Sequence, residues 1–289
     1  MKSGFVNIFG KPNAGKSTLL NALLGEKLAI VSSKVQTTRH RIKGFLTVPG
    51  EYQIVFSDTP GIIEPKYKLH EKMMFHVKGA LEDADVALLL MDAKDNTDEN
   101  HQLFSSLHLK VPAIVILNKM DAVKKEKMTE LETFYLQQPY CKKVISISAL
   151  KKINTNKLLE FIKDYLPEGE PFYNEDDVSD LPTRFFVSEL IREKIYNLYD
   201  DEIPYQVAVV INEFTERENI IKIQADIVVY RESQKAIILG EKGSTIKRLG
   251  ILARTDIEKF LQSKIYLQLF VKVKPKWREN EQQLKEYGY

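Results

Sequence analysis

The sequence predicts an α/β domain, with a mostly parallel sheet and helices on both faces, followed by a smaller α+β domain. Three observations support this prediction. A chain of 289 residues suits two domains, because domains usually hold roughly 100–200 residues. Apolar strand-like runs alternate with amphipathic helical stretches through about the first 165 residues. An acidic stretch with three prolines then interrupts this pattern, and a different order of helices and strands follows it.

The first domain is predicted from five apolar runs, each of which we expect to form a strand. Short apolar runs separated by helical stretches are typical of βαβ units, whose parallel strands are covered by helices. We expect this domain to span residues 1–166. The five runs are Gly4 to Phe9, Tyr52 to Ser57, Ala84 to Met91, Ala113 to Asn118 and Lys143 to Ile147.

The acidic stretch, residues 167–182, is predicted to link the two domains. From Glu168 to Asp180 it holds six acidic residues and no basic ones, and it shows little periodicity. Prolines and a lack of periodicity are typical of segments between domains.

The second domain is expected to span residues 183–289. Phe185 to Tyr199 has helical spacing, while Tyr205 to Thr215 and Ile220 to Arg231 alternate like the strands of a hairpin. Thr245 to Leu261 is again amphipathic with a helical period, and Ile265 to Val273 is strand-like. This mixture of helices and strands predicts an α+β domain.

Composition excludes several classes of protein. A hydrophobic content of 44% and a charged content of 28% are ordinary for a globular protein and argue against disorder. No apolar run approaches the ~18 residues of a membrane span, and the N-terminus lacks the pattern of a secretory signal, so we expect a cytoplasmic protein. The single cysteine, Cys141, cannot form an internal disulfide.

Charge is unevenly distributed, although the net charge is only +2. From Lys235 to Arg278 there are eleven Lys and Arg residues against three acidic ones, which gives +8. This part of the chain is therefore where we expect a polyanion to bind.

The segment Gly10 to Thr18, GKPNAGKST, matches the phosphate-binding pattern G-x-x-x-x-G-K-[ST] and lies between a strand-like run and a helical one. Glycines permit the tight turn that points successive N–H groups at phosphates. Lys16 would reach the β and γ phosphates, and the Ser17 hydroxyl would ligate Mg2+. The alternative is a chance glycine turn before a helix. The loop residues predicted to bind a nucleotide are Gly10, Lys11, Pro12, Asn13, Ala14, Gly15, Lys16, Ser17 and Thr18.

Two further motifs follow strand-like runs and make a chance turn an unsatisfactory explanation. In DTPG, Asp58 would hold the metal indirectly and the Gly61 N–H would meet the γ phosphate. In NKMD, the carboxylate of Asp121 can accept from both N1–H and the 2-amino group of guanine, which adenine does not offer. The residues that we assign here to nucleotide binding are Asp58, Thr59, Pro60, Gly61, Asn118, Lys119 and Asp121.

A fourth motif, ISA, follows the fifth run. It would present Ser148 and the Ala149 N–H to the base, with the N–H directed at the guanine O6. This signal is weak alone, but it comes in the order that the other motifs require.

In this order, the motifs resemble those of the translation-factor class of P-loop GTPases. The resemblance implies GTP and GDP as ligands with Mg2+, and a switch threonine that ligates the metal. We place that role on Thr38 within QTTRHR, with Thr37 as the other candidate. Lys16, Thr38 and Gly61 are then the predicted catalytic residues, and Ser17 and Thr38 the metal ligands.

One position departs from the Ras-like pattern. Ile62 stands where those proteins carry a glutamine that positions water, so we expect slow intrinsic hydrolysis, or water held by another group. An asparagine at the place of Asn13 marks potassium-stimulated relatives, so K+ is a candidate cofactor. The alternative is that Asn13 only shapes the loop.

The segment Gly240 to Gly243, GEKG, precedes an amphipathic helix and resembles the GXXG loop of a type II KH domain. In such domains the glycines let an RNA backbone approach closely. The predicted RNA-binding residues are Gly240, Glu241, Lys242, Gly243, Lys247 and Arg248. The alternative for each cation is a solvated helix face.

Nearly the whole chain resembles the Era family of bacterial ribosome-assembly GTPases, through FVNIFGKPNAGKSTLLNALLG, KVQTTRHRI, SELIREKI and FVKVKPKWRE. The resemblance implies binding to the 3′ end of 16S rRNA, and a role in 16S rRNA processing and 30S ribosomal subunit assembly. It also implies association with the inner face of the membrane; we expect a monomer. Two alternatives remain: a GTPase whose C-terminal module binds a protein or a membrane surface, and an ATP-using enzyme, which Asp121 disfavours.

Overall fold

A six-stranded sheet forms the centre of the first part of the chain. The structure, a computed structural model, describes residues 1–289. The strand order is β2-β3-β1-β4-β5-β6, and every neighbouring pair is parallel except β2 with β3. The prediction of a mostly parallel sheet is therefore confirmed. The strands are β1 (Lys2–Phe9), β2 (Ile42–Val48), β3 (Tyr52–Asp58), β4 (Val86–Asp92), β5 (Ala113–Asn118) and β6 (Cys141–Ser146).

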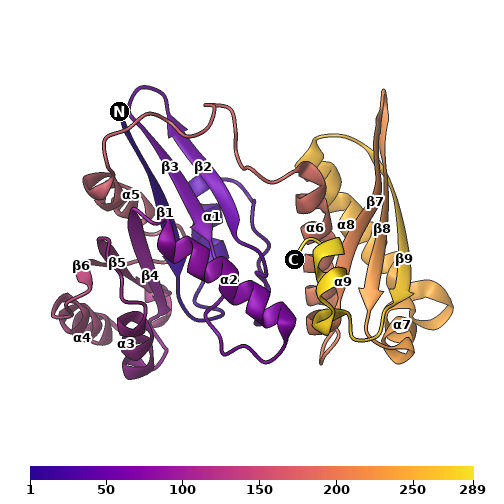
Figure 1. Cartoon of the computed structure of the whole chain (residues 1–289), viewed down its shortest axis with the longest axis horizontal. Helices are drawn as coiled ribbons and strands as arrows, with labels where there is room; N and C mark the ends of the chain where they lie inside the picture. Colours follow the sequence, from indigo (N-terminus) through magenta and orange to yellow (C-terminus); the bar gives the residue numbers. More distant parts are fainter. The chain divides into compact units, whose positions relative to one another are not determined.

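Helices cover both faces of this sheet (Figure 1). On one face, α2, α3 and α4 pack against an apolar cluster that includes Leu89, Phe104 and Leu131. On the other face, α1 contacts α5, β2 and β3. A parallel sheet needs this cover on both faces because its strands are apolar throughout, and every residue of β5 is buried. The helices are α1 (Lys16–Leu24), α2 (Lys68–Glu82), α3 (Thr97–Ser106), α4 (Lys125–Leu136) and α5 (Thr155–Tyr165), with a 3-10 turn at Met120–Ala122.

The acidic stretch, residues 167–182, packs against the first sheet. The side-chain oxygen of Gln53 accepts hydrogen bonds from the backbone N–H groups of Phe172 at 2.7 Å and Tyr173 at 3.0 Å. The Tyr173 ring stacks on Phe45 with 3.8 Å between ring centroids. The Phe45 N–H also donates to the carbonyl of Val178 at 2.9 Å. By its contacts the stretch belongs to the first compact unit, which comprises Met1–Glu64 and Met73–Asp180.

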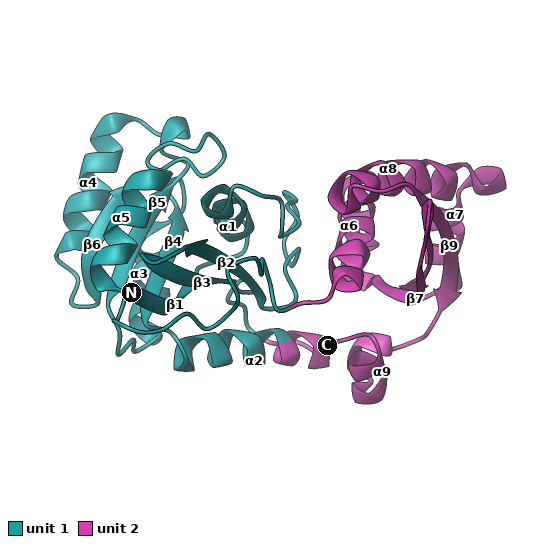
Figure 2. Ribbon diagram, turned by 90° about the horizontal axis from the view of Figure 1, so that it is seen from above, with its two compact units in different colours: residues 1–64, 73–180 teal, residues 65–72, 181–289 magenta.

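The second compact unit comprises Pro65–Lys72 and Leu181–Tyr289 (Figure 2). Its three-stranded sheet has the order β7-β8-β9, with β7 antiparallel and β9 parallel to β8. This confirms the predicted α+β fold. Its elements are α6 (Thr183–Leu198), β7 (Ala208–Arg217), β8 (Ile220–Val229), α7 (Glu232–Leu239), α8 (Ser244–Leu261), β9 (Ile265–Val273) and α9 (Glu281–Glu286), with 3-10 turns at Pro204–Gln206, Glu241–Gly243 and Trp277–Glu279.

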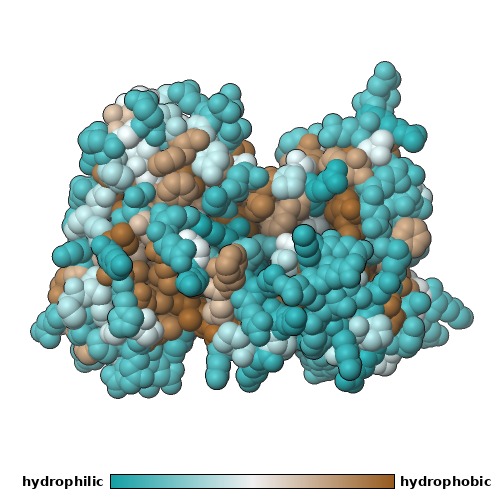
Figure 3. Space-filling model, viewed as in Figure 1, coloured by the Kyte–Doolittle hydropathy of each residue, from teal (hydrophilic) through white to brown (hydrophobic).

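Alternation along the strands builds the core of this unit. Every second residue of β8 and β9, such as Ile223 and Leu267, packs against apolar residues of α6 and α8, such as Ile191 and Ile257. Trp277 is fully buried, and its indole N–H donates to the carbonyl of Gln206 at 3.1 Å. Burial makes Trp277 a packing residue. None of the helices combines the length and the apolar character needed to cross a membrane. Hydrophilic residues predominate on the face shown in Figure 3, with hydrophobic residues in smaller areas between them.

Candidate functional site

The loop between β1 and α1 is packed so closely that it needs glycine at two positions. Gly10 and Gly15 have φ of +155° and +104°. A Cβ on Gly10 would lie 2.1 Å from the carbonyl oxygen of Leu90, and one on Gly15 would lie 2.3 Å from the amide nitrogen of Asn118. Gly61, from the DTPG motif, is equally restricted, because its Cβ would meet Pro12 at 2.7 Å. The three glycines therefore bring the phosphate loop, DTPG and NKMD together.

Lys16 is buried at the start of α1, and its ammonium group lies inside the loop. Its Nζ donates to the carbonyls of Gly10 at 3.2 Å and Lys11 at 2.8 Å. Burial lowers the pKa of Lys16 to about 8, and the nearby negative charge of Asp58 opposes that shift. The hydrogen-bond partners of this ammonium group are neutral carbonyls, and its surroundings exclude water. It is therefore well suited to pair with a phosphate group.

Ser17, Thr38 and Asp58 form a cluster of oxygens from three segments. The Ser17 hydroxyl lies 2.8 Å from Thr38 Oγ1 and donates to Asp58 Oδ2 at 2.5 Å, while Thr38 Oγ1 donates to the same oxygen at 3.2 Å. Burial raises the pKa of Asp58, against the charge of Lys16 and the two hydroxyl hydrogen bonds, and its Oδ1 has no partner. Hydroxyl and carboxylate oxygens are the donors that Mg2+ prefers, so the residues present fit this metal.

The same contacts separate the two candidate switch threonines. Thr38 joins the oxygen cluster, whereas the Thr37 hydroxyl donates to the carbonyl of Lys34 at 2.7 Å. This arrangement supports the choice of Thr38 over Thr37 as a metal ligand.

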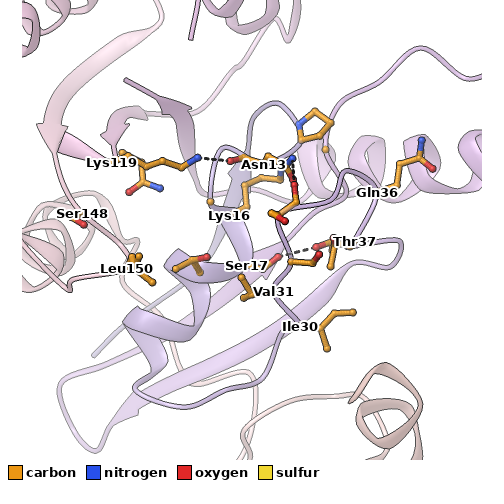
Figure 4. Close-up of a pocket in the computed structure, with 18 of the residues that line it drawn as sticks. Asn13, Lys16, Ser17, Ile30, Val31, Gln36, Thr37, Lys119, Ser148 and Leu150 are labelled. Atoms are coloured by element: carbon orange, nitrogen blue, oxygen red, sulfur yellow. Dashed lines mark hydrogen bonds between the residues drawn. The ribbon is translucent and has the colours of Figure 1, made fainter. Parts of the chain in front are cut away.

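A pocket of about 530 Å³ extends from these groups to the NKMD motif. Figure 4 shows Lys119, Ser148 and Leu150 at one end of the pocket and Ser17, Thr37 and Ile30 toward the other. The amide of Asn118 donates to the carbonyl of Ala14 at 2.8 Å, and Lys119 Nζ donates to the carbonyl of Asn13 at 3.0 Å. These two hydrogen bonds connect NKMD directly to the phosphate loop.

Asp121 lies at the far end of the pocket as an ionised acceptor. A hydrogen bond from Ser148 lowers the pKa of Asp121, and the ammonium of Lys151, 3.0 Å from Oδ2, acts in the same direction. Its carboxylate can therefore accept two N–H groups of a guanine edge. The Ala149 N–H donates to the side-chain oxygen of Asn118 at 3.0 Å, so its predicted contact with the guanine O6 would compete with this bond.

Not every predicted residue faces the pocket. Thr59 is fully buried, and its hydroxyl donates to the carbonyl of Ile8 at 2.7 Å. Lys11 forms an ion pair with Glu99 of α3. Of the predicted nucleotide residues, those that line the pocket are Pro12, Asn13, Gly15, Lys16, Ser17, Thr18, Gly61, Asn118, Lys119, Asp121 and Ser148; those that do not are Gly10, Lys11, Ala14, Asp58, Thr59, Pro60 and Ala149.

Sequence reasoning missed part of the lining. Ile30, Val31 and Leu150 add apolar surface, and Leu150 is 81% exposed although it is apolar. The place of Leu150 directly after the ISA motif was the one available signal for its role. Ile62, by contrast, packs against the apolar cluster under α2, and its N–H donates to the carbonyl of Gly10 at 3.2 Å, so its side chain does not position water.

The second unit presents the GEKG loop between α7 and α8. Gly240 has φ +69°, and its Cβ would lie 2.1 Å from the hydroxyl of Thr245. Gly243 has φ +77° with open space around it. The side chains of Lys242, Lys247 and Arg248 are exposed, so they can meet phosphates. Next to the loop, three apolar side chains are also exposed: Ile237, Ile251 and Leu252.

Both units match known protein families. A model of the 50S ribosome-binding GTPase family matches residues 5–119, and a model of the KH domain matches residues 202–278. The GTPase Era of Geotalea daltonii is 45% identical over 290 residues, which cover 99% of this chain and 97% of that protein. The GTPase Era of Clostridium botulinum (strain Langeland) is 44% identical, covering 100% of this chain and 98% of its own.

Two solved structures are similar over the full length. One is a tyrosine-to-alanine variant of Aquifex aeolicus Era bound to GDP and aluminium fluoride, with 41% identity and a TM-score of 0.96. The other is Era in complex with MgGDPNP and nucleotides 1506–1542 of 16S ribosomal RNA, with the same identity and TM-score. Each match covers 100% of this chain and 99% of the solved chain.

Proposed function

The chain belongs to the GTPase Era family, and we propose that it uses GTP to control its binding to the 3′ end of 16S ribosomal RNA. The observation that carries this proposal is the presence of a nucleotide-type pocket and a cationic glycine loop in one chain. The first unit holds the Ser17, Thr38 and Asp58 oxygens beside Lys16, and the second holds exposed cations around the GEKG loop. A role in 16S rRNA processing and 30S subunit assembly in the cytoplasm follows as part of the same proposal.

The reaction converts GTP and water into GDP and phosphate without a covalent intermediate. Lys16 neutralises charge on the β and γ phosphates, and the N–H groups of the phosphate loop and Gly61 orient them. Ser17 and Thr38 would hold Mg2+ directly while Asp58 orients both hydroxyls, and the bound metal would supply charge neutralisation at the phosphates. Ile62 leaves the attacking water to backbone groups or to a partner, so intrinsic turnover is expected to be slow.

We also propose that K+ assists this chemistry at Asn13. The Asn13 amide nitrogen donates to the carbonyl of Ser33 at 2.7 Å, so a side-chain amide and a main-chain carbonyl from two facing segments lie together. Carbonyl oxygens are suitable ligands for a hard cation beside the phosphates.

Turnover measured in potassium and in sodium buffer of equal ionic strength tests the K+ proposal. We expect about tenfold faster hydrolysis in potassium, or ~1.4 kcal/mol off the barrier, and no cation preference in Asn13→Ala. Equal rates for the unaltered protein would restrict Asn13 to shaping the loop.

RNA binding is tested through Lys242. Its φ of +50° lies in the left-handed region, which aspartate tolerates, so Lys242→Asp reverses one charge of the loop without a clash of the kind expected at Gly240. Equilibrium binding to a single-stranded copy of the 16S 3′ end should weaken by at least about tenfold, with a smaller salt dependence. Lys259→Asp, the same change at the opposite end of α8, is the matched control and should bind normally.

A result without RNA binding would count against the proposed function. One such result is that the unaltered protein binds the 3′-end copy no more tightly than an unrelated RNA. The other is that Lys242→Asp binds the 3′-end copy as tightly as the unaltered protein does. Either result would mean that the second unit of this GTPase serves another partner.

A further inference from the structure

The sheet of the second unit has a face that α6 and α8 do not cover. Along β9, residues Leu267, Leu269 and Val271 point into the core. Because side chains alternate along a strand, Tyr266, Gln268, Phe270 and Lys272 lie on the opposite face. The register pairs them with Lys222, Gln224, Asp226 and Val228 of β8, which are likewise absent from the core.

The C-terminal segment covers only one end of this outer face. Ala208 and Val228 lie there and are buried, and Asp226 is only 6% exposed. Burial raises the pKa of Tyr287, with contributions from the charges of Glu286 and Asp226, so the end of the chain lies near Asp226. The rest of the outer face, along β9, stays open to solvent.

Two aromatic rings stand on this open part. Tyr266 is 50% exposed and Phe270 is 47% exposed. They are four residues apart on one strand, which places them about 13 Å apart at ~3.3 Å per residue. That separation is too large for one base but suits two bases of an extended strand. Between them, Gln268 and Gln224 hydrogen-bond to each other at 3.0 Å and offer further amide groups.

The charge around the rings is positive. From Ser263 to Arg278 the chain has four lysines, one arginine and no acidic residue. The two acidic residues on the outer face are already neutralised: Asp226 by Lys272 at 2.5 Å, and Glu213 by Lys222 at 3.2 Å. Lys264 and Lys274 are exposed at the two ends of β9. Exposed rings beside unopposed cations are complementary to single-stranded nucleic acid, whose bases stack and whose phosphates attract cations.

We propose that this outer face of β9, with Tyr266 and Phe270 as stacking platforms, is a second RNA-binding surface distinct from the GEKG loop. The helix that leads into that loop, α7, contacts β9, so one RNA strand can pass from the loop to the outer face around the edge strand. The inference rests on the proposed RNA-binding function and extends it. It assigns the second surface to nucleotides next to those held at the loop.

The test measures RNA affinity of the full chain for two probes. One is a short single-stranded copy of the 16S 3′ end, and the other is a longer RNA with the span crystallised with the relative, nucleotides 1506–1542. The double variant Tyr266→Ala, Phe270→Ala should raise the Kd for the longer RNA by at least about tenfold while the Kd for the short RNA changes less than about twofold. Lys264→Glu with Lys274→Glu, which leaves the core untouched, should also weaken the longer RNA and reduce its salt dependence.

Two controls separate stacking from folding. Tyr266→Phe with Phe270→Tyr keeps both rings and should retain full affinity. Phe75→Ala removes an exposed ring from the first unit and should have no effect. Full affinity of the double alanine variant for the longer RNA, while Lys242→Asp still weakens both probes, would overturn the second surface and leave the proposed function standing. Failure of the unaltered protein to bind either RNA would overturn both.

Discussion

At the scale of single residues, the base-binding end of the pocket depends on Asp121 and the groups that keep it ionised. Ser148 and Lys151 both lower its pKa, so the carboxylate remains an acceptor at neutral pH. Guanine can satisfy such an acceptor with two donors, whereas a base that lacks these donors cannot form the two hydrogen bonds. We therefore expect specificity for guanine to depend mainly on this one side chain.

Replacing that side chain should change which base is bound. Asp121→Asn presents an amide nitrogen in place of one carboxylate oxygen, which suits the carbonyl that xanthine carries where guanine has an amino group. We expect GTP affinity to fall by at least about 100-fold while XTP affinity rises. Competition of the two nucleotides for a fluorescent analogue measures the shift, and unchanged GTP binding would contradict the assignment of the pocket.

The predictable residues are those whose chemistry requires a fixed residue type at a fixed spacing. Lys16, Ser17 and Asp121 belong to motifs that the sequence displays, and the structure places all three on one pocket. Ile30 could not be predicted, because the path of its loop, and not a motif, brings it to the pocket, and the only signal for Leu150 was its place directly after the ISA motif. The choice between Thr37 and Thr38 likewise needed the contact of Thr38 with Ser17.

At the scale of elements, five strands of the first sheet follow from apolar runs, but β2 does not. Its segment, IKGFLTV, is only partly buried and pairs antiparallel at the edge through a turn at Gly50, where φ is +75°. The helices α7 and α9 were also missed, because each is at most eight residues long and shows too little periodicity. The acidic stretch was identified by composition, but its docking depends on Gln53, whose partners lie more than 100 positions away.

The docked stretch should contribute to the stability of the first unit. Tyr173→Ala removes the ring that stacks on Phe45 at 3.8 Å and should cost ~1–2 kcal/mol, or roughly 2–8 °C in the unfolding midpoint of that unit. Glu175→Ala, an exposed change in the same stretch, is the control and should leave the midpoint unaltered. Calorimetry measures both. Equal unfolding midpoints for the two variants would mean that the acidic stretch does not stabilise the first unit.

At the scale of the whole molecule, the chain joins a GTPase unit to a KH unit. Both units were predictable because their local patterns and motifs agree with the fold. Such agreement leaves a sequence few competing structures. The proposed function also requires that GTP binding in the first unit changes RNA binding by the second. A nucleotide can shift the RNA-binding equilibrium only if the GTP and GDP forms differ in their affinity for RNA.

Control of RNA binding by GTP can be measured as equilibrium binding of a single-stranded copy of the 16S 3′ end to the full chain, with GDP and with a non-hydrolysable GTP analogue. We predict salt-dependent binding, an affinity that differs at least about fivefold between the two nucleotides, and loss of that binding in Lys242→Asp. Equal RNA affinity in the two nucleotide states would contradict the claim that GTP controls RNA binding.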